Sequence, residues 1–350
     1  MKAAVLTAPG TLELKEVPTP EPDADSALMR VRACAVCGSD VRIARHGNPR
    51  VTPPQILGHE AAGEVVAVGR NVSKIKVGDK ISLGADIPCG NCSFCEDGMA
   101  NNCQINYAMG YQFAGSFAQY VLLNRLMVDY GPIHAIPPGV TFEEAALAEP
   151  LACVLNALER TPVQFRDDVV VIGAGPIGCM IIPVAKAHGA RRVIVIQRSP
   201  ARAEMARRFG ADVVITTGGA DPVGAVLDLT DGLGAHLVIT ANPSPSTHAD
   251  AIAMARNRGR VNLFGGLPAN SRIELDTNLI HYKELTVSGA HGSLPPHHRR
   301  ALEMIASGLV RVGDLITHRF SLDQTPEAFA AAQNRAGGRV VVEPWGRTDA

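Results

Sequence analysis

The second half of the chain alternates short apolar runs with longer amphipathic segments. The short runs are rich in β-branched residues, and the segments between them have helical periodicity, which predicts β-α-β units and a doubly wound parallel sheet. The expected strands are Val169–Ile172, Val193–Ile196, Val213–Thr216, Leu237–Thr240, Val261–Phe264 and Leu285–Val287.

The two ends of the chain have a different pattern. Residues 1–35 alternate short strand-like runs with proline-rich turns, which indicates a β-rich domain. From about residue 293 we expect a return to this domain, with helices at Ala301–Leu309 and Pro326–Asn334 and a closing strand at Gly338–Glu343. We therefore predict an α/β protein with a first domain at 1–150 and 293–350 and a nucleotide-binding domain at 151–292.

A glycine-rich turn follows the first strand of the nucleotide-binding domain. Gly173 would make the turn, Gly175 would let the backbone approach a pyrophosphate, and Gly178 would let the next helix pack on the strand. The residues between them, at the expected helix start, are Pro176 and Ile177. A helix N-terminus favours an anion, so this turn predicts a dinucleotide site. The motif alone is weak, but the strand at Val193–Ile196 completes the β-α-β unit.

Composition limits the class of protein. The 350 residues are 46% hydrophobic and 19% charged, which is typical of a globular protein with sizeable cores. A net charge of −1 gives no attraction to nucleic acid or an anionic membrane, and we expect neither as a partner. No apolar run approaches a membrane span. Met1–Leu6 reads as a first strand rather than a signal peptide, so the expected location is cytoplasmic.

Four of the eight cysteines fall on one short loop at residues 88–104, with Cys-x-x-Cys-x-x-Cys-x7-Cys spacing. With no signal peptide expected, metal ligation is favoured over disulfides. Four thiolates close a tetrahedral shell, which predicts a structural zinc. An iron–sulfur cluster or unligated thiols are the alternatives. These residues are Cys89, Cys92, Cys95 and Cys103.

A second candidate metal site is formed by Cys37, His59 and Glu60. Three protein ligands with an open fourth position describe a catalytic zinc. The spacing alone does not decide, since a single cysteine or histidine is more often a packed core residue. The surrounding glycines and the nucleotide site downstream favour zinc.

These motifs together resemble the zinc-dependent medium-chain dehydrogenase family. The resemblance rests on Gly58-His-Glu-x2-Gly63-x5-Gly69-x2-Val72, Cys37-Gly-Ser-Asp40, the cysteine loop and the glycine turn, in the order of the family. Glu149–Cys153 and Leu315–Phe320 resemble the sorbitol and threonine dehydrogenase branch. The resemblance implies a GroES-like catalytic domain beside a Rossmann domain, two zinc ions per chain and a homodimer or homotetramer.

The family also implies roles for individual residues. Cys37, His59 and Glu60 would bind the catalytic zinc, and Glu149 would lie beside it or exchange with Glu60. Ser39 occupies the position of the hydroxyl that relays the proton, with an ordinary turn serine as the alternative. His46 could pass the proton onward or be a loop histidine, and Asp40 would hold the loop.

The cofactor preference depends on the end of the second strand of the nucleotide-binding domain. NAD-preferring sites carry Asp or Glu about 20 residues beyond the glycines, whereas this chain has Gln197. Arg198, Ser199 and Arg202 follow, and guanidinium groups match a 2′-phosphate. We therefore expect NADP(H) to be preferred. The alternative is a solvated helix face and acceptance of both cofactors.

The expected reaction is hydride transfer between an alcohol or its ketone and the nicotinamide, with zinc as a Lewis acid. Departures from sorbitol dehydrogenases leave the substrate open: Arg42 and Ile43 replace His and Tyr, and His291-Gly292-Ser293 replaces an Arg-Tyr pair. Polyols, cyclitols, other secondary alcohols and threonine all stay possible. The rival hypotheses are a zinc-independent quinone or enone reductase of this fold and a non-catalytic NADPH-binding protein.

Overall fold

The computed structural model describes residues 1–218, 221–268, 270–334 and 338–346. The chain forms two compact units: Met1–Ala152 with Gly292–Ala350, and Cys153–His291. We call them unit 1 and unit 2. The sequence placed the corresponding boundaries after residues 150 and 292. One helix, α5 (Ala148–Arg160), contains the first boundary.

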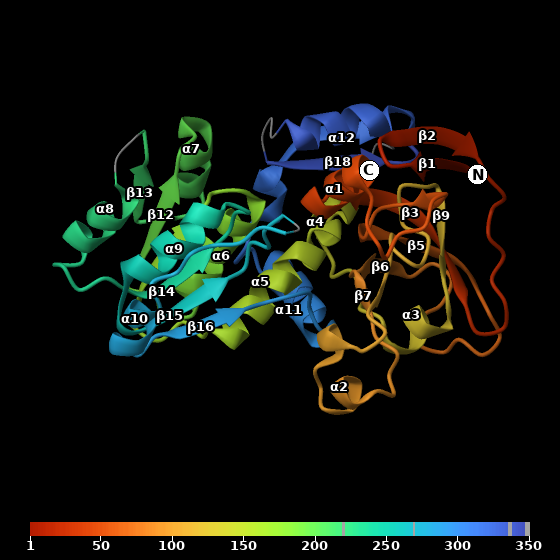
Figure 1. The fold of residues 1–350 in the computed structure, drawn as a ribbon. Coiled ribbons are helices and arrows are strands. Elements are labelled where there is room, and N and C mark those ends of the chain that lie inside the picture. Colours follow the sequence, from red (N-terminus) through yellow and green to blue (C-terminus); the bar gives the residue numbers. More distant parts are fainter. Residues whose placement is uncertain (219–220, 269, 335–337, 347–350) are drawn as a thin grey trace. The chain divides into compact units, whose positions relative to one another are not determined.

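Unit 1 is built on β-sheets (Figure 1). Its largest sheet has the order β10-β6-β5-β3-β18-β17, and β9 also pairs with β3. These strands are β3 (Ala27–Ala35), β5 (Glu60–Val68), β6 (Lys80–Leu83), β9 (Tyr120–Leu123), β10 (Ile133–Ala135), β17 (Ile316–Ser321) and β18 (Arg339–Glu343). A three-stranded sheet and a two-stranded sheet contain β1 (Lys2–Ala8), β2 (Thr11–Glu16), β4 (Gln55–Ile56), β7 (Asp86–Ile87) and β8 (Tyr107–Ala108).

Short helices connect these strands. The α-helices of unit 1 are α1 (Gly38–His46), α2 (Ser93–Glu96), α3 (Arg125–Tyr130), α4 (Phe142–Ala146), α11 (Pro295–Ala306) and α12 (Thr325–Gln333). The 3-10 turns are η1 (Ala100–Asn102), η2 (Val312–Leu315) and η3 (Leu322–Gln324). The helix expected at Ala301–Leu309 begins earlier, at Pro295, because proline is well suited to a first helical turn. Helix α1 was not anticipated from the sequence.

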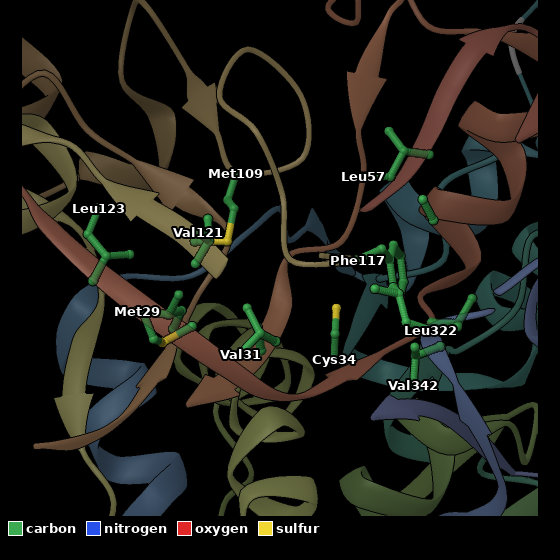
Figure 2. Close-up of a cluster of buried hydrophobic side chains, with 14 of the residues drawn as sticks. Met29, Val31, Cys34, Leu57, Met109, Phe117, Val121, Leu123, Leu322 and Val342 are labelled. Carbon is green, nitrogen blue, oxygen red and sulfur yellow. The ribbon is translucent and has the colours of Figure 1, made fainter. Parts of the chain in front are cut away.

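The core of unit 1 gathers around β3. Figure 2 shows Met29, Val31 and Cys34 of this strand among buried side chains from other parts of the unit. Phe117 lies beside Cys34, and Leu322 and Val342 come from the C-terminal segment. Strand β18 pairs with β3 through Val341 and Val342. The C-terminal segment is therefore part of the same core, and it reaches the strand that leads into Cys37.

Unit 2 is a six-stranded sheet in which every neighbouring pair is parallel, as the sequence pattern predicted. Its order is β13-β12-β11-β14-β15-β16, the dinucleotide-binding order 3-2-1-4-5-6. The strands are β11 (Asp168–Ile172), β12 (Arg192–Gln197), β13 (Val213–Thr216), β14 (Ala235–Thr240), β15 (Ala255–Leu263) and β16 (Thr286–Gly289). Its helices are α6 (Pro176–Ala187), α7 (Pro200–Arg208), α8 (Pro222–Leu229), α9 (Pro245–Met254) and α10 (Thr277–Tyr282).

One strand of unit 2 is longer than expected. Strand β15 begins at Ala255, before the expected start at Val261, because it already pairs there with β14 through Ala235. Its polar first half, Arg256–Arg260, hid this from the hydrophobic pattern. The fold around the glycine turn follows the expectation, with α6 packed on β11 and β12. Within the described part of the chain, no helix is long and apolar enough to cross a membrane.

Candidate metal centres and nucleotide site

Pairing of β3 with β5 brings the first candidate trio together. Cys37 is the N-cap of α1, two residues beyond the end of β3 at Ala35. Ala35 pairs with Glu60, the first residue of β5, and His59 precedes it. One ligand atom from each of Cys37, His59 and Glu60 lies within 4.8 Å of the others. A thiolate, an imidazole and a carboxylate at this separation suit a zinc ion.

Asp40 fixes the orientation of the trio. Its Oδ1 lies 3.2 Å from Nδ1 of His59, and its Oδ2 accepts a hydrogen bond from the backbone N–H of Cys37 at 3.0 Å. Burial lowers the pKa of His59, but the Asp40 carboxylate and the Cys37 side chain together outweigh it, so this pKa lies well above its usual value. The structure agrees with the expectation that Asp40 holds the loop.

Arg339 binds the third member of the trio. Its Nη2 lies 3.0 Å from Oε1 of Glu60, and both side chains are buried. Burial raises the pKa of Glu60, and the charge of Arg339 opposes that rise. Oε2 of Glu60 has no hydrogen-bond donor among the described residues other than the adjacent Cys37 thiol. A buried carboxylate oxygen in this state fits a metal ligand, because a cation would compensate its charge.

Glu149 lies close to the trio without joining it. It is in the first turn of α5 and buried, and its carboxylate is not among the grouped ligand atoms. Burial raises its pKa to about 8, with His59 opposing the rise and Glu60 and Asp86 adding to it. The expectation that Glu149 lies beside the zinc or exchanges with Glu60 stays a prediction.

The two residues expected to relay a proton are placed differently. The Ser39 hydroxyl lies 3.4 Å from Nε2 of His59. His46 is the last residue of α1 and exposed, two helical turns or ~10 Å along the helix from Ser39. The structure therefore brings Ser39 to the trio and leaves His46 at the surface.

Tyr111 was missed by the sequence analysis. Its ring centroid lies 6.1 Å from that of His59, and Ser39 is within hydrogen-bonding range of its hydroxyl. Arg50 covers its ring, with the guanidinium carbon 4.8 Å from the centroid. Burial raises the pKa of Tyr111. A tyrosine within an ordinary loop sequence gives no signal of such a position.

The four cysteines of the loop form a tight cluster. The Sγ–Sγ distances are 3.5 Å for Cys92–Cys95, 3.9 Å for Cys89–Cys95 and 3.9 Å for Cys92–Cys103. A tetrahedron with ~2.3 Å zinc–sulfur bonds has edges of ~3.8 Å. The backbone N–H groups of Gln104 and Cys95 lower the pKa of Cys92 to about 6, which favours a thiolate. All eight cysteines of the chain are free thiols, and this cluster fits one zinc ion.

The glycine turn has the geometry that a pyrophosphate needs. A Cβ at Gly178 would lie 1.9 Å from the carbonyl oxygen of Gly173, so α6 packs on β11 only with glycine there. Gly173 has a φ of +109°. Gly175, the N-cap of α6, has open space where its side chain would be. Pro176 and Ile177 form the first turn of α6 and are half-buried.

Strand β12 is followed by a loop that carries arginine side chains. Oε1 of Gln197 accepts hydrogen bonds from the backbone N–H groups of Arg198 at 2.7 Å and Ser199 at 3.3 Å. Ser199 is the N-cap of α7, and Arg202 lies within its first turn. Arg198 is exposed and has no ion pair with any residue the structure describes. The loop thus contains no carboxylate that would repel a phosphate.

A parallel sheet with a glycine turn and a β-rich unit with a Cys-His-Glu trio define a nucleotide-dependent oxidoreductase of the metal-dependent type. Comparison with known proteins supports this class. Residues 23–130 match the model of the alcohol dehydrogenase GroES-like domain, and residues 176–307 match that of the zinc-binding dehydrogenase.

Relatives match over nearly the whole chain. Sorbitol dehydrogenase of Bacillus subtilis (strain 168) is 32% identical over 95% of this chain and 93% of its own length. L-threonine 3-dehydrogenase of Pyrococcus horikoshii is 36% identical over 97% of this chain and 98% of its own. A zinc-binding dehydrogenase from Sinorhizobium meliloti 1021, solved bound to NADP, superposes with a TM-score of 0.92 at 31% identity, covering 98% of this chain and 99% of that one.

The chain belongs to the zinc-dependent medium-chain alcohol dehydrogenase family. It is an oxidoreductase of the alcohol or polyol dehydrogenase type, with zinc and a nicotinamide as its cofactors and a small-molecule alcohol as its substrate class. The predicted fold, a GroES-like domain with a Rossmann domain, is confirmed.

Proposed function

We propose that this enzyme transfers hydride between a secondary alcohol, polyol or cyclitol, or the corresponding ketone, and a nicotinamide cofactor, with NADP(H) preferred. The observation that carries the proposal is the Cys37-His59-Glu60 trio, whose ligand atoms lie within 4.8 Å of one another at the junction of β3 and β5. The catalytic unit comprises residues 1–150 and 293–350, and residues 151–292 bind the nucleotide.

The trio would hold the catalytic zinc, which supplies a Lewis acid for the substrate oxygen when it is bound. Asp40 keeps Nδ1 of His59 engaged, so that Nε2 is the nitrogen available for ligation. Arg339 holds one oxygen of Glu60 and leaves the other for the metal. Ser39, next to Nε2 of His59, is placed to accept the proton of the substrate hydroxyl.

Two other residues have less direct roles. Glu149, buried and with its pKa raised to about 8 in part by the charge of Glu60, would exchange with Glu60 as a ligand during turnover. His46 would receive the proton from Ser39 only through an intermediate group, because it lies at the other end of α1.

The cysteine cluster would hold a second zinc in a structural role. Its four sulfur atoms complete a tetrahedral shell and leave no position for a substrate. Two zinc ions per chain, one in each group, follow from this assignment. The assembly is proposed to be a homodimer or homotetramer, as the family resemblance implies.

The preference for NADP(H) rests on the loop after β12. The side-chain oxygen of Gln197 accepts hydrogen bonds from the backbone N–H groups of Arg198 and Ser199, and the 2′ position has no carboxylate beside it. Arg198, Ser199 and Arg202 would surround that position. Guanidinium groups pair with phosphate oxygens through charge-assisted hydrogen bonds. The Sinorhizobium meliloti structure, which was solved with NADP, supports this preference.

The test measures the formation of the reduced nicotinamide through its absorbance. Zinc-loaded enzyme is offered pooled polyols, cyclitols, threonine and simple secondary alcohols, with NADP⁺ and NAD⁺ in parallel. We expect turnover that is faster with NADP⁺, and a metal content of two zinc ions per chain. Turnover that is unchanged after removal of all zinc would contradict the proposal and favour a zinc-independent reductase.

A further inference from the structure

Arg50 is a half-buried cation without an acidic partner among the residues that the structure describes. Its guanidinium carbon lies 4.8 Å from the centre of the Tyr111 ring, and Nη2 donates a hydrogen bond to the carbonyl oxygen of Asn106. A guanidinium has more N–H groups than one carbonyl oxygen can accept from. Donors of Arg50 are therefore available for a further partner.

The Tyr111 ring connects Arg50 to the metal trio. Its centre lies 6.1 Å from that of the His59 ring. Asp40 engages Nδ1 of His59, so zinc and substrate would approach from the Nε2 side, where the Ser39 hydroxyl lies 3.4 Å away. Tyr111 is within hydrogen-bonding range of Ser39 and so lies on that same side. The two ring contacts put Arg50 within reach of a substrate only a few carbon atoms long.

The loop of Tyr111 holds the ring in place. The Tyr111 carbonyl oxygen accepts a hydrogen bond from Nε2 of Gln55 at 2.6 Å. Gly110 has a φ of +74°, and a Cβ there would lie 2.9 Å from the backbone nitrogen of Gly58, the residue before His59. A loop packed this closely fixes the ring relative to His59. A cation held against such a ring loses less conformational freedom when it binds an anion.

Arg339, the other arginine described at the trio, differs from Arg50 in its partners. It is buried, and its Nη2 lies 3.0 Å from Oε1 of Glu60. Its charge is therefore matched by a carboxylate of the protein. The charge of Arg50 is matched by no described carboxylate, and a half-buried guanidinium is screened less than one in open water. The planar fork of a guanidinium suits the oxygens of a carboxylate or phosphate.

We infer that Arg50 is a specificity-determining residue that binds an anionic group of the substrate, a carboxylate or phosphate a few atoms from the carbon that exchanges hydride. The inference rests on the proposed function, because the trio places the reacting carbon. Tyr111 is a positioning residue, since it acts by holding the guanidinium near the trio. The substrate class is thereby narrowed to secondary alcohols, or their ketones, that carry such a group.

Matched compounds of three chain lengths test this inference. The carboxylates are 3-hydroxybutyrate, 4-hydroxypentanoate and 5-hydroxyhexanoate, and 1,3-butanediol, 1,4-pentanediol and 1,5-hexanediol are their neutral counterparts. The phosphate esters at the primary hydroxyl of these diols form the second anionic arm. Zinc-loaded enzyme is assayed for kcat/KM with NADP⁺. Calorimetry gives the Kd of each compound for zinc-loaded enzyme saturated with NADPH, which cannot oxidise an alcohol.

Four enzymes are compared: the wild type, Arg50→Gln, Arg50→Lys and the control Arg125→Gln. Arg125 is 74% exposed and paired with Asp129. We expect the wild type to prefer an anionic compound over its diol by roughly tenfold or more at one chain length at least, as charge-assisted hydrogen bonds imply. Arg50→Gln should lower this ratio at least about fivefold and Arg50→Lys by less, because lysine keeps the charge without the fork. Arg125→Gln should not change it.

The ratio separates binding from a merely structural role. If Arg50 served only to join Tyr111 and Asn106, its loss would lower kcat/KM for diols and anions alike and leave the ratio unchanged. The inference is overturned by a wild-type enzyme that shows no preference for an anion at any chain length. It is equally overturned by a folded Arg50→Gln enzyme with the wild-type ratio, or by a folded Arg50→Lys enzyme with that ratio where Arg50→Gln does not fold.

A failure of the proposed function gives a different result. The enzyme would then show no zinc-dependent turnover of any pooled alcohol, whereas the ratio of the dissociation constants would still report on Arg50. Turnover without a preference for either anionic arm would keep the proposed function and reject the role of Arg50.

Discussion

Arg339 Nη2 lies 3.0 Å from Glu60 Oε1, and this pair joins the last strand of the chain to the candidate zinc ligands. Both side chains are buried, and Arg339 also contacts the carbonyl oxygen of Val36, one residue before Cys37. A buried carboxylate left without a cation is costly. We therefore expect the C-terminal strand β18 to support the candidate metal centre as well as the core.

Replacing Arg339 tests this relationship. Arg339→Gln leaves Glu60 buried and unpaired, so we expect a loss of about 3–5 kcal/mol in the free energy of unfolding of unit 1 without zinc. The loss should be smaller with zinc bound, because the ion then compensates Glu60. Denaturant unfolding followed by the fluorescence of Trp345, the only tryptophan, measures both values.

Arg319→Gln is the matched control. Arg319 lies on the neighbouring strand β17 and pairs with Glu143 at 2.6 Å, but its side chain is 38% exposed. A pair that is partly open to solvent contributes about 0–1 kcal/mol, and zinc should not change the result. Equal losses in the two variants, with and without zinc, would show that Arg339 has no special relation to the metal centre.

Asp40→Asn should weaken the catalytic zinc site selectively. Asp40 orients His59 and binds the backbone of Cys37, and removing a carboxylate behind a histidine ligand typically costs about 10–100-fold in metal affinity or activity. Zinc content is measured during titration with a chelator. The cysteine cluster serves as the internal control, since its zinc should be retained. Loss of both ions together would point to general unfolding instead.

A pair of histidines, His298 buried and His134 half-buried, predicts that the protein is sensitive to acid. His298 lies 3.0 Å from His134 between their Nδ1 atoms and 3.2 Å from the Ser82 hydroxyl. Burial lowers the pKa of His298 to about 3 and that of His134 to about 4. The charge of His134 adds to the shift of His298, and the charge of Arg299 adds to that of His134, while Glu303 opposes the latter. The unfolded chain takes up these protons below an ordinary histidine pKa of about 6.5, and the folded chain does not.

Above about pH 6.5 these two histidines should therefore not affect the free energy of unfolding. Between pH 6.5 and 4 the free energy of unfolding should fall as the pH drops, by up to about 1.4 kcal/mol per pH unit for each histidine. His298→Gln should flatten this slope by up to about one proton, whereas His318→Gln, on β17, should not. Trp345 fluorescence in denaturant at several pH values measures the slope. A slope that His298→Gln leaves unchanged would show that this pair does not cause the acid sensitivity.

The preference between NADP⁺ and NAD⁺ should change when a carboxylate is introduced into the loop after β12. Gln197→Asp places a charge where a 2′-phosphate would lie, and it should lower the ratio of kcat/KM for NADP⁺ over NAD⁺ by roughly tenfold or more. Arg198→Ala should lower the same ratio by removing a phosphate partner. Arg207→Ala, further along α7 and paired with Glu204, is the control. A ratio near one in the wild type would contradict the NADP(H) preference.

Local motifs made much of the fold and both metal groups predictable. The glycine turn, the β-branched runs and the cysteine spacing are each determined by neighbours in the chain, and the structure places them as expected. The trio was also found, because Cys37, His59 and Glu60 lie within a short stretch that a single strand pair closes.

The residues that support the trio were harder to predict. In the sequence, Arg339 is part of an apolar closing strand and Tyr111 is a loop residue. Each acquires its position through contacts between segments far apart in the chain: β18 pairs with β3, and the Tyr111 ring lies near that of His59. Periodicity and spacing do not carry that information. His46 is the opposite case: the sequence suggested that it could take a proton onward from Ser39, but helix α1 places the two residues apart.

The most direct test of the account is the activity of Cys37→Ser with NADP⁺ and the best pooled alcohol. Loss of one thiolate from the trio should remove one of two zinc ions and reduce turnover by several orders of magnitude, while the cysteine cluster keeps its zinc and NADPH still binds to unit 2. That result would place catalysis at Cys37, His59 and Glu60. A folded Cys37→Ser enzyme with wild-type turnover would contradict the account and assign the chemistry to a zinc-independent site.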